Sequence, residues 1–152
     1  KVDEKNMELL EVFRMFHKLN FSVLLQNMTQ SEFVTMKQIQ SCSREDPRGR
    51  AGISDIVKNM KSLPSAVSRT LKSLEEKEWI CRTVDKSNRR NTYVELTEEG
   101  AKEIQAATGH VAAFMNRILQ QVDPEDMEKL TKFLRELYEI FRDGLEDAKH
   151  SG

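Results

Sequence analysis

Two short segments with helical periodicity follow each other so closely that they restrict how this chain can fold. The first, residues 53–61, has one apolar face formed by Ile53, Ile56, Val57 and Met60. The second begins near Pro64, because proline lacks the amide hydrogen that would be unsatisfied in the first turn of a helix. Only about two residues separate the segments, so the two helices must cross at a steep angle. The sequence therefore predicts a helix-turn-helix.

The period of the apolar side chains changes from 3.6 to 2 after Trp79. Residues 80–85 and 92–97 alternate as two antiparallel strands do. The polar stretch KSNRRN between them suits a tip that projects as a wing. The predicted fold is mainly α with a small β wing (α+β), a winged helix-turn-helix.

Helical segments are also predicted before this unit. Residues 7–27 are apolar on more than one stripe, so we expect one helix that is buried on more than one side. Thr29 or Ser31 is expected to cap a second helix, and the charged stretch of residues 43–52 is expected to be an exposed loop. Ser54 is the expected N-cap of the helix over residues 53–61.

Two long helices follow the wing. Thr97 is expected to cap a helix that runs to about Gln121, a length of roughly 37 Å. Asp123 and Pro124 open the last helix, whose near-heptad stripe needs a partner helix from the same chain or from a second copy. The stripe consists of Met127, Leu130, Leu134, Leu137, Phe141 and Leu145.

Length and composition favour one soluble domain. The chain has 152 residues, of which 32% are charged and 38% hydrophobic. No apolar run is long enough to span a bilayer and no signal segment stands at the N-terminus, so we expect a cytoplasmic protein without membrane contact.

Positive charge is concentrated in residues 58–90. This segment has nine basic and four acidic residues, a net charge of +5, whereas the whole chain carries −1. A basic segment on an acidic body is typical of a local polyanion-binding surface, although a solvated helix face would show the same charge.

The helix that begins at Pro64 has two distinct faces. Val67, Leu71 and Leu74 are spaced to point into the domain, which leaves a second face of small hydroxyls followed by cations. The second face consists of Ser65, Ser68, Arg69 and Lys72. Such a face suits the major groove of DNA, and a wing-tip arginine suits the minor groove.

Residues Ile53–Gly100 resemble the winged helix-turn-helix of the MarR family of bacterial regulators. The resemblance rests on SAVSRTLKSLEEK, on the wing sequence that runs from Asp85 to the NRR of residues 88–90, and on VELTEEG. It implies an obligate dimer that binds pseudo-palindromic double-stranded DNA, usually a repressor relieved by a small ligand or an oxidant. The chain would be a single MarR-like domain over residues 1–152, with dimerisation helices at 1–28 and 101–148 and a DNA-binding lobe at 29–100.

The resemblance and the charge pattern together give a set of candidate DNA contacts. Ser65, Ser68 and Arg69 would read or brace bases, Lys61 and Lys72 would hold phosphates, and Arg90 would probe the minor groove. The full set is Ser54, Lys61, Pro64, Ser65, Ala66, Ser68, Arg69, Lys72, Lys86, Arg89 and Arg90.

Three positions depart from the family pattern. Asn88 stands where the family often has an aspartate that braces the wing arginine, so the brace would be a hydrogen bond. Glu78 stands where the family commonly has glycine, so the turn that the family forms before Trp79 is not assured in this chain. Leu63 stands in the place of a capping serine, so we expect Ser62 to cap the helix one residue early.

A small-molecule effector is expected between the long helices and the DNA-binding lobe. The candidate pocket residues are Arg14, His17, Phe21, Phe33 and Lys37, although core and interface packing explains them equally.

Three alternatives remain. A metal- or redox-responsive regulator would use His17, Cys42 and His110, but no ligand spacing supports it, and Cys81 is expected to face the core. A winged-helix protein-interaction module would not need so cationic a surface. An enzyme would need a nucleophile, base or metal set, which the scattered histidines do not provide, so we expect no catalytic residue, metal or cofactor.

Overall fold

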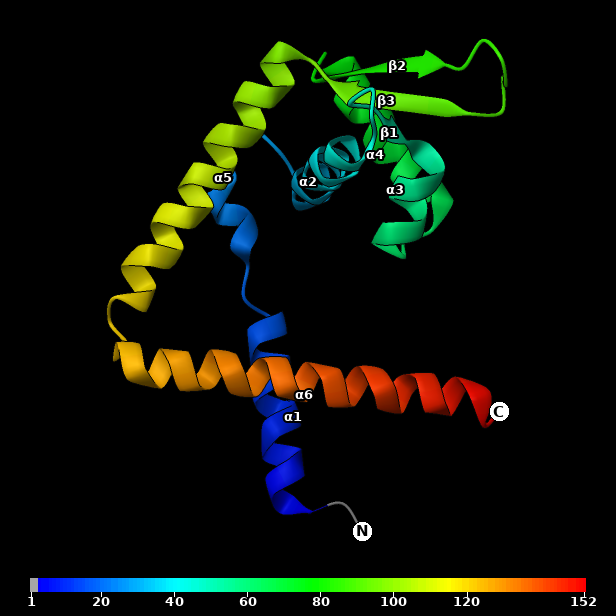
Figure 1. Ribbon diagram of the computed structural model, residues 1–152. Helices are drawn as coiled ribbons and strands as arrows, with labels where there is room; N and C mark the ends of the chain where they lie inside the picture. The colour runs from blue at the N-terminus through cyan, green and yellow to red at the C-terminus, as the bar shows by residue number, and fades with distance from the viewer. Residues whose placement is uncertain (1–2) are drawn as a thin grey trace. The chain divides into compact units, whose positions relative to one another are not determined.

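The computed structural model describes residues 3–152, so the first two residues of the predicted dimerisation segment 1–28 lie outside the described part (Figure 1). The chain divides into two compact units, one that ends at Val111 and one over Ala112–Gly152. The first contains the helix-turn-helix and the sheet, and the second contains the last helix.

The N-terminal helix α1 spans Glu4–His17, and a separate 3₁₀ turn, η1, spans Phe21–Leu24. The prediction of one helix over residues 7–27 is therefore wrong. The side chain of Asn20 accepts a hydrogen bond from the Ser22 amide at 3.2 Å, which favours a new turn over a continued helix. No residue of α1 is buried, so the apolar side chains of this helix are not covered within one chain as the sequence pattern predicted.

Helix α2 spans Gln30–Glu45 and begins with a capping box. Thr29 Oγ1 accepts from the Glu32 amide at 3.1 Å, and Glu32 Oε1 accepts from the Thr29 amide at 3.0 Å. This confirms Thr29, rather than Ser31, as the cap. The prediction of a loop over residues 43–52 is wrong at both ends, because α2 continues to Glu45 and Ala51–Gly52 forms strand β1.

Helices α3 (Ile53–Met60) and α4 (Pro64–Glu76) form the predicted helix-turn-helix. Both predicted caps are wrong. Gly52 occupies the N-cap of α3, and Ser54 lies inside that helix. Leu63 occupies the N-cap of α4, and the Ser62 hydroxyl instead donates to the Met60 carbonyl at 3.3 Å.

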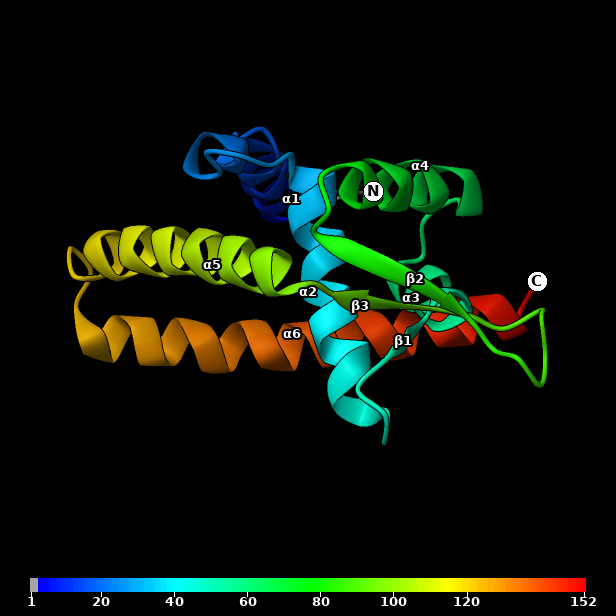
Figure 2. The same ribbon diagram turned by 90° about the horizontal axis from the view of Figure 1, so that it is seen from above.

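Strands β2 (Ile80–Val84) and β3 (Thr92–Leu96) form the predicted hairpin. The sheet order is β1-β3-β2, and all pairs are antiparallel (Figure 2). The register runs from Ile80 opposite Leu96 to Val84 opposite Thr92. Ile80 is the buried residue of β2, so the prediction that Cys81 faces the core is wrong: Cys81 is exposed on an edge strand.

The core joins α2, α3, α4, the sheet and the first turns of α5. Its most deeply buried hydrophobic side chains are Met36, Ile39, Ile56, Val67, Leu71, Leu74, Val94 and Ile104. Because Val67, Leu71 and Leu74 all belong to this core, the predicted inward face of α4 is confirmed.

A left-handed residue connects α4 to the sheet. Glu78 has φ 62°, the Trp79 amide donates to the Leu74 carbonyl at 3.0 Å, and the Glu78 amide donates to the Glu75 carbonyl at 3.0 Å. These are the two hydrogen bonds of a Schellman motif. The turn before Trp79 therefore forms without the glycine that usually accompanies it.

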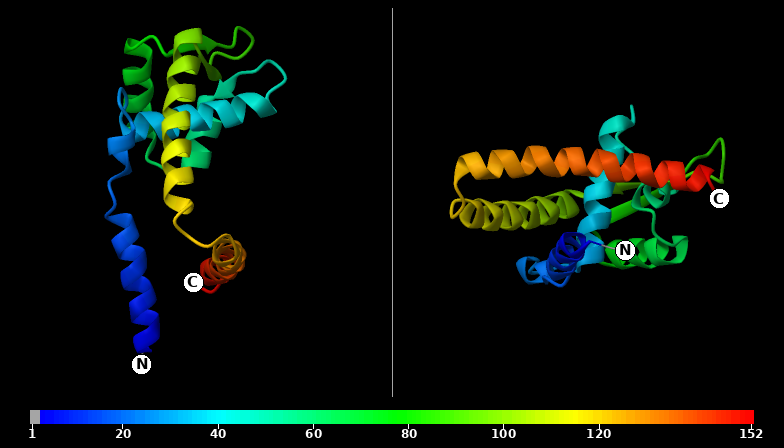
Figure 3. Two further views of the ribbon diagram at one scale, coloured as in Figure 1. Left: turned by 90° about the vertical axis from the view of Figure 1, so that its left-hand side faces the viewer. Right: turned by 90° about the horizontal axis from the view of Figure 1, so that it is seen from below.

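Helix α5 spans Glu98–Leu119 as one continuous helix (Figure 3). Thr97 Oγ1 accepts from the Gly100 amide at 3.0 Å, which confirms the predicted cap. Helix α6 spans Pro124–His150, and Asp123 caps it as predicted. No residue of α6 is buried: Leu130, Leu134, Phe141 and Leu145 of its near-heptad stripe are exposed, and Met127 and Leu137 are half-buried.

Candidate nucleic-acid interface

The buried face of α4 fixes which of its side chains face outward. Val67, Leu71 and Leu74 are each at most 1% exposed, so this helix cannot rotate without losing its core contacts. The outward side chains of Ser65, Ser68, Arg69 and Lys72 are exposed, and Ala66 is half-buried. The structure thus brings the predicted helix residues together on one accessible face.

The first turn of α4 presents one backbone donor. Leu63 provides no side-chain cap, and Pro64 occupies the first turn. Proline has no N–H, and the Ala66 amide donates to the Leu63 carbonyl at 3.0 Å, which leaves the Ser65 amide as the donor of this turn; the helix dipole adds to the attraction for an anion. Lys61, which has φ 51° in the turn between α3 and α4, adds an exposed ammonium group nearby in the sequence. This turn is suited to a phosphate oxygen.

The C-terminal end of α4 is tied to the start of α2. Lys77 Nζ lies 2.8 Å from Glu32 Oε2 and also donates to the Asn27 carbonyl at 3.3 Å. Burial raises the pKa of Glu32, but the hydrogen bond and charge of Lys77 and the amide of Thr29 outweigh it, so the pKa lies below its ordinary value. Because the Glu32 carboxylate stays ionised, its ion pair with Lys77 holds the start of α2 against the end of α4.

Local hydrogen bonds shape the wing between β2 and β3. The Asp85 carboxylate accepts from the Ser87 hydroxyl at 2.7 Å and from its amide at 3.0 Å, which lowers the pKa of Asp85. The Asp85 amide donates to the Asn91 carbonyl at 2.9 Å, closing the loop. Asn88 Oδ1 accepts from the backbone amide of Arg90 at 3.2 Å. Asn88 therefore makes a bracing hydrogen bond, but it fixes the backbone of Arg90 and not its guanidinium.

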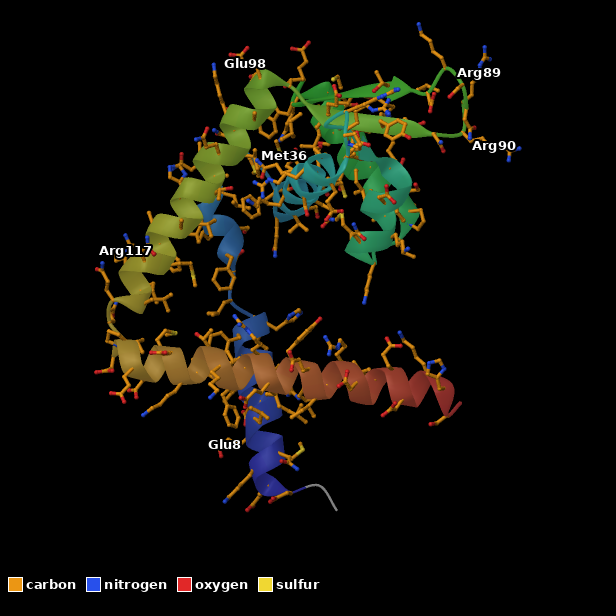
Figure 4. The ribbon with its side chains drawn as sticks, in the orientation of Figure 1. Glu8, Met36, Arg89, Arg90, Glu98 and Arg117 are labelled. Carbon is orange, nitrogen blue, oxygen red and sulfur yellow. The ribbon has the colours of Figure 1, made fainter. Side chains whose placement is uncertain are left out.

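The wing tip is cationic and accessible. Lys86, Arg89 and Arg90 are all exposed. Arg89 and Arg90 lie at the far end of the hairpin and point away from the body of the lobe (Figure 4). This geometry suits insertion of an arginine into a narrow groove of high negative potential.

A cavity of about 600 Å³ lies where the wing meets the start of α3. Ser54 and Arg90, two predicted contact residues from different elements, both line it. Arg82 also lines it, and Arg82 Nε lies 3.3 Å from Glu75 Oε2. The sequence prediction missed Arg82 because the alternation of β2 placed it on the same side as Ile80 and Val84. The position of Arg82 within the basic segment of residues 58–90 was the one sequence feature that could have indicated it as a contact residue.

The predicted effector residues are not among those that line three cavities of the DNA-binding lobe. Arg14, His17 and Phe21 are exposed, and Phe33 and Lys37 are half-buried. The effector pocket therefore stays a prediction.

The two cysteines have different surroundings. The buried Cys42 Sγ accepts from Gln38 Nε2 at 3.6 Å and from Asn59 Nδ2 at 3.7 Å, and Cys81 is exposed. Within residues 3–152, no group of three or more histidine, cysteine or acidic side chains is placed to hold a metal ion. None of the helices in the same part of the chain combines the length and apolarity needed to cross a bilayer.

The fold and the exposed cationic elements define a winged helix-turn-helix, and comparisons with known proteins agree. Residues 28–92 match the model of the MarR family. This segment is therefore similar to MarR-family domains, in agreement with the sequence resemblance. Proteins of this family are transcription regulators and not enzymes.

Solved structures with this fold include several MarR-family regulators. MepR, a transcription regulator of the Staphylococcus aureus multidrug efflux pump MepA, is 20% identical, with a TM-score of 0.67 over 92% of this chain and 99% of that chain. Sco3205 from Streptomyces coelicolor, a MarR family transcriptional regulator in complex with DNA, is 21% identical, with a TM-score of 0.70 over 91% and 89%. A mutant of MarR from E. coli, complexed with operator DNA, is 20% identical, with a TM-score of 0.66 over 90% and 99%. At these identities the likeness shows a common fold.

Proposed function

We propose that this protein is a cytoplasmic, homodimeric transcription regulator that binds pseudo-palindromic double-stranded DNA. The observation that carries the proposal is the fixed orientation of α4, whose buried apolar face leaves hydroxyl and cationic side chains exposed. Each protomer would place α4 in a major groove and the wing in the adjacent minor groove. Sco3205 and the mutant of MarR from E. coli, which share the fold, are in complex with DNA.

The proposed contacts divide by chemistry. Ser65, Ala66, Ser68 and Arg69 approach base edges, and Arg90 approaches the floor of the minor groove. The remaining groups bind phosphates or the sugar-phosphate backbone, which gives position and not sequence preference. They are Ser54, Lys61, Pro64, Lys72, Lys86 and Arg89.

The proposed dimer uses residues 1–28 and 101–148. Helices α1 and α6 have no buried residue, although both carry many large apolar side chains. Exposed apolar surface of this extent is typical of an interface. Because the stripe of α6 has near-heptad spacing, a second copy of the chain supplies the helices that would cover it.

We further propose that the regulator represses transcription by occupying its operator and that a small molecule relieves the repression. The ligand would favour a spacing of the two α4 helices that no longer fits the operator. The alternatives, a metal- or redox-responsive regulator and a protein-interaction module, predict different outcomes of the test below.

The test is to sequence the genomic DNA that the purified protein retains and to footprint the enriched fragment. The expected site has two inverted half-sites about one helical turn, roughly 34 Å, apart. Sedimentation should give twice the 17.6 kDa mass of one chain. Failure to enrich any DNA would favour the protein-interaction module, and a monomer at the same concentration would contradict the dimer. If added metal or oxidant changes the amount of enriched DNA and small organic molecules do not, the metal- or redox-responsive regulator would be favoured.

A further inference from the structure

The wing receives support from β1 only at its base. Strand β1 is two residues long, and these residues pair with Val94 and Tyr93 of β3. Val84, Thr92 and the loop between them lie beyond these pairs as a two-stranded extension (Figure 1). A two-stranded hairpin is marginally stable by itself and twists readily. The direction of the wing therefore depends on the contacts of Tyr93, the residue nearest the tip that pairs with β1.

Arg50, which directly precedes β1, lies over the ring of Tyr93. Arg50 Cζ is 3.9 Å from the ring centroid, a distance typical of a cation–π contact. The sheet register explains this contact. Ala51 is opposite the buried Val94, which puts that pair on the core face of the sheet. Because side chains alternate along a strand, Arg50 and Tyr93 both lie on the other face.

The loop between α2 and β1 holds Arg50 in this place. The Asp46 carboxylate accepts from the amides of Arg48 at 3.1 Å and Arg50 at 3.0 Å. Gly49, whose amide donates to the Asp46 carbonyl at 3.0 Å, has φ 68°, a conformation that glycine adopts without strain. The hydrogen bond from the Arg50 amide is the main cause that lowers the pKa of Asp46. The carboxylate therefore stays ionised, 3.8 Å from Arg50 Nε.

Stacking and charge hold the Arg50 guanidinium. Its side chain is 18% exposed, and within residues 3–152 the buried Nε has no hydrogen-bond acceptor. A planar, weakly hydrated guanidinium suits a place on an aromatic ring. The charge of Arg50 also acts on Asp85, which follows β2: the Ser87 hydroxyl and amide are the main causes that lower the pKa of Asp85, and Arg50 adds to the shift. Arg50 thus acts on both strands at the base of the wing.

We propose that Arg50 is a positioning residue that holds the wing in the direction required for Arg90 to enter the minor groove, a step that rests on the proposed function. Arg50 acts through the wing and makes no contact with DNA. Tyr93 is three residues after Arg90, so a change of direction of β3 at the ring moves the tip (Figure 4). A wing that is fixed before binding loses less conformational freedom on association, which raises affinity.

The first test measures the wing in the full-length protein without DNA. Arg50→Met keeps an unbranched side chain and removes the guanidinium. The NMR order parameters of amides 86–90 should fall by at least about 0.1–0.2, on a scale where rigid backbone has about 0.85. Arg48→Met, the matched control, makes the same charge change at an exposed side chain of the same loop and should leave these values unchanged. Equal order parameters in Arg50→Met and the wild type would overturn the proposal.

Two further variants test the contact with the ring. Tyr93→Leu removes the ring and should mobilise the wing as Arg50→Met does. The double variant should be no more mobile than either single variant, because both substitutions break one contact. Arg50→Lys keeps the charge beside Asp46 but lacks the planar group, so it should give a smaller effect and serves if Arg50→Met does not fold. Additive effects in the double variant, or a wild-type wing in Tyr93→Leu, would overturn the assignment to this contact.

DNA binding separates positioning from a general loss of stability. Arg50→Met should weaken binding of the enriched fragment about threefold to tenfold. The same substitution should change affinity less than about twofold when Arg89→Ala and Arg90→Ala are also present, because a wing without these arginines gains nothing from its direction. Equal losses in both backgrounds would show that Arg50 only stabilises the fold and would overturn the proposal. A protein that binds no DNA would contradict the proposed function, while the order parameters would still decide whether Arg50 holds the wing.

Discussion

Lys77 Nζ lies 2.8 Å from Glu32 Oε2, and this ion pair joins the end of α4 to the start of α2. The Glu32 side chain is 4% exposed and the Lys77 side chain 36% exposed. Lys77 Nζ also lies 4.6 Å from the centroid of the Trp79 ring. The pair therefore links the helix proposed to contact DNA with the capping box of its neighbour and with the entry to the sheet.

Lys77→Met should destabilise the protein because it leaves the buried Glu32 carboxylate without a counter-charge. Breaking a fully buried pair costs about 3–5 kcal/mol, but water screens the partly exposed Lys77, so we expect about 1–3 kcal/mol. Urea unfolding at a fixed protein concentration measures the difference. Lys129→Met is the matched control, because its pair with Glu125 is exposed on both sides and should contribute less than about 0.5 kcal/mol. Equal losses in the two variants would contradict this role of Lys77.

The same pair should make stability depend on pH. The pKa of Glu32 in the folded protein lies below its ordinary value near 4.5, so its ionised form stabilises the fold above that pH. This contribution is lost as the pH falls from 4.5 through the lower, folded-state pKa. Glu32→Gln should therefore show a smaller loss of unfolding free energy between about pH 5 and pH 3 than the wild type. A wild-type slope in the variant would show that the other carboxylates with lowered pKa, Asp46 and Asp85, account for the whole effect.

Glu78→Gly should stabilise the protein. Glu78 has φ 62°, a conformation that costs a residue with a Cβ atom about 1–2 kcal/mol and costs glycine little. Because glycine also raises the entropy of the unfolded chain, we expect a net gain of about 0.5–1 kcal/mol in unfolding free energy. Lys72→Gly, at an exposed position in the middle of α4, should instead lose about 1 kcal/mol. A loss in both variants would contradict the strain assigned to Glu78.

Gly100→Ala should be strongly destabilising, whereas Gly109→Ala in the same helix should not. A Cβ atom at Gly100 would lie 2.0 Å from the Trp79 carbonyl oxygen, so backbone must move at a cost of about 2 kcal/mol or more. A Cβ atom at Gly109 would meet nothing within 4 Å, and alanine should add up to about 1 kcal/mol through its helix propensity. Thermal unfolding of the two variants checks the contrast. Similar midpoints would contradict the close approach of α5 to Trp79.

The helix-turn-helix, the wing and the two long C-terminal helices could be predicted because each leaves a local signal. Pro64, the alternation after Trp79, and the caps Thr97 and Asp123 all act on residues close in sequence. The errors arose where distant or competing contacts decide. Ala51 and Gly52 form a strand because they pair with β3, which is distant in sequence. The apolar pattern of residues 7–27 predicts one helix, but α1 ends at His17, and the Ser22 amide then donates to the Asn20 side chain, which favours a new turn.

The candidate DNA-binding site could also be predicted in part from the sequence. The exposed face of α4 follows from the positions of Val67 and Leu71, which helical spacing places on the opposite side. Arg82 was missed because the alternation of β2 groups it with apolar residues, and only the cavity that it shares with the start of α3 shows its place.

The salt dependence of DNA binding tests the central claim most directly. The dissociation constant of the enriched fragment should rise steeply with salt, because each phosphate contact releases counterions. For each wing engaged, Arg90→Ala should reduce the slope of the logarithmic plot by about one, and Arg89→Ala with Arg90→Ala should reduce it by about two. Lys129→Ala with Lys132→Ala makes the same charge change on α6 and should leave the slope unchanged. Binding that does not respond to salt, or equal slopes in the wing and α6 variants, would contradict DNA recognition by α4 and the wing.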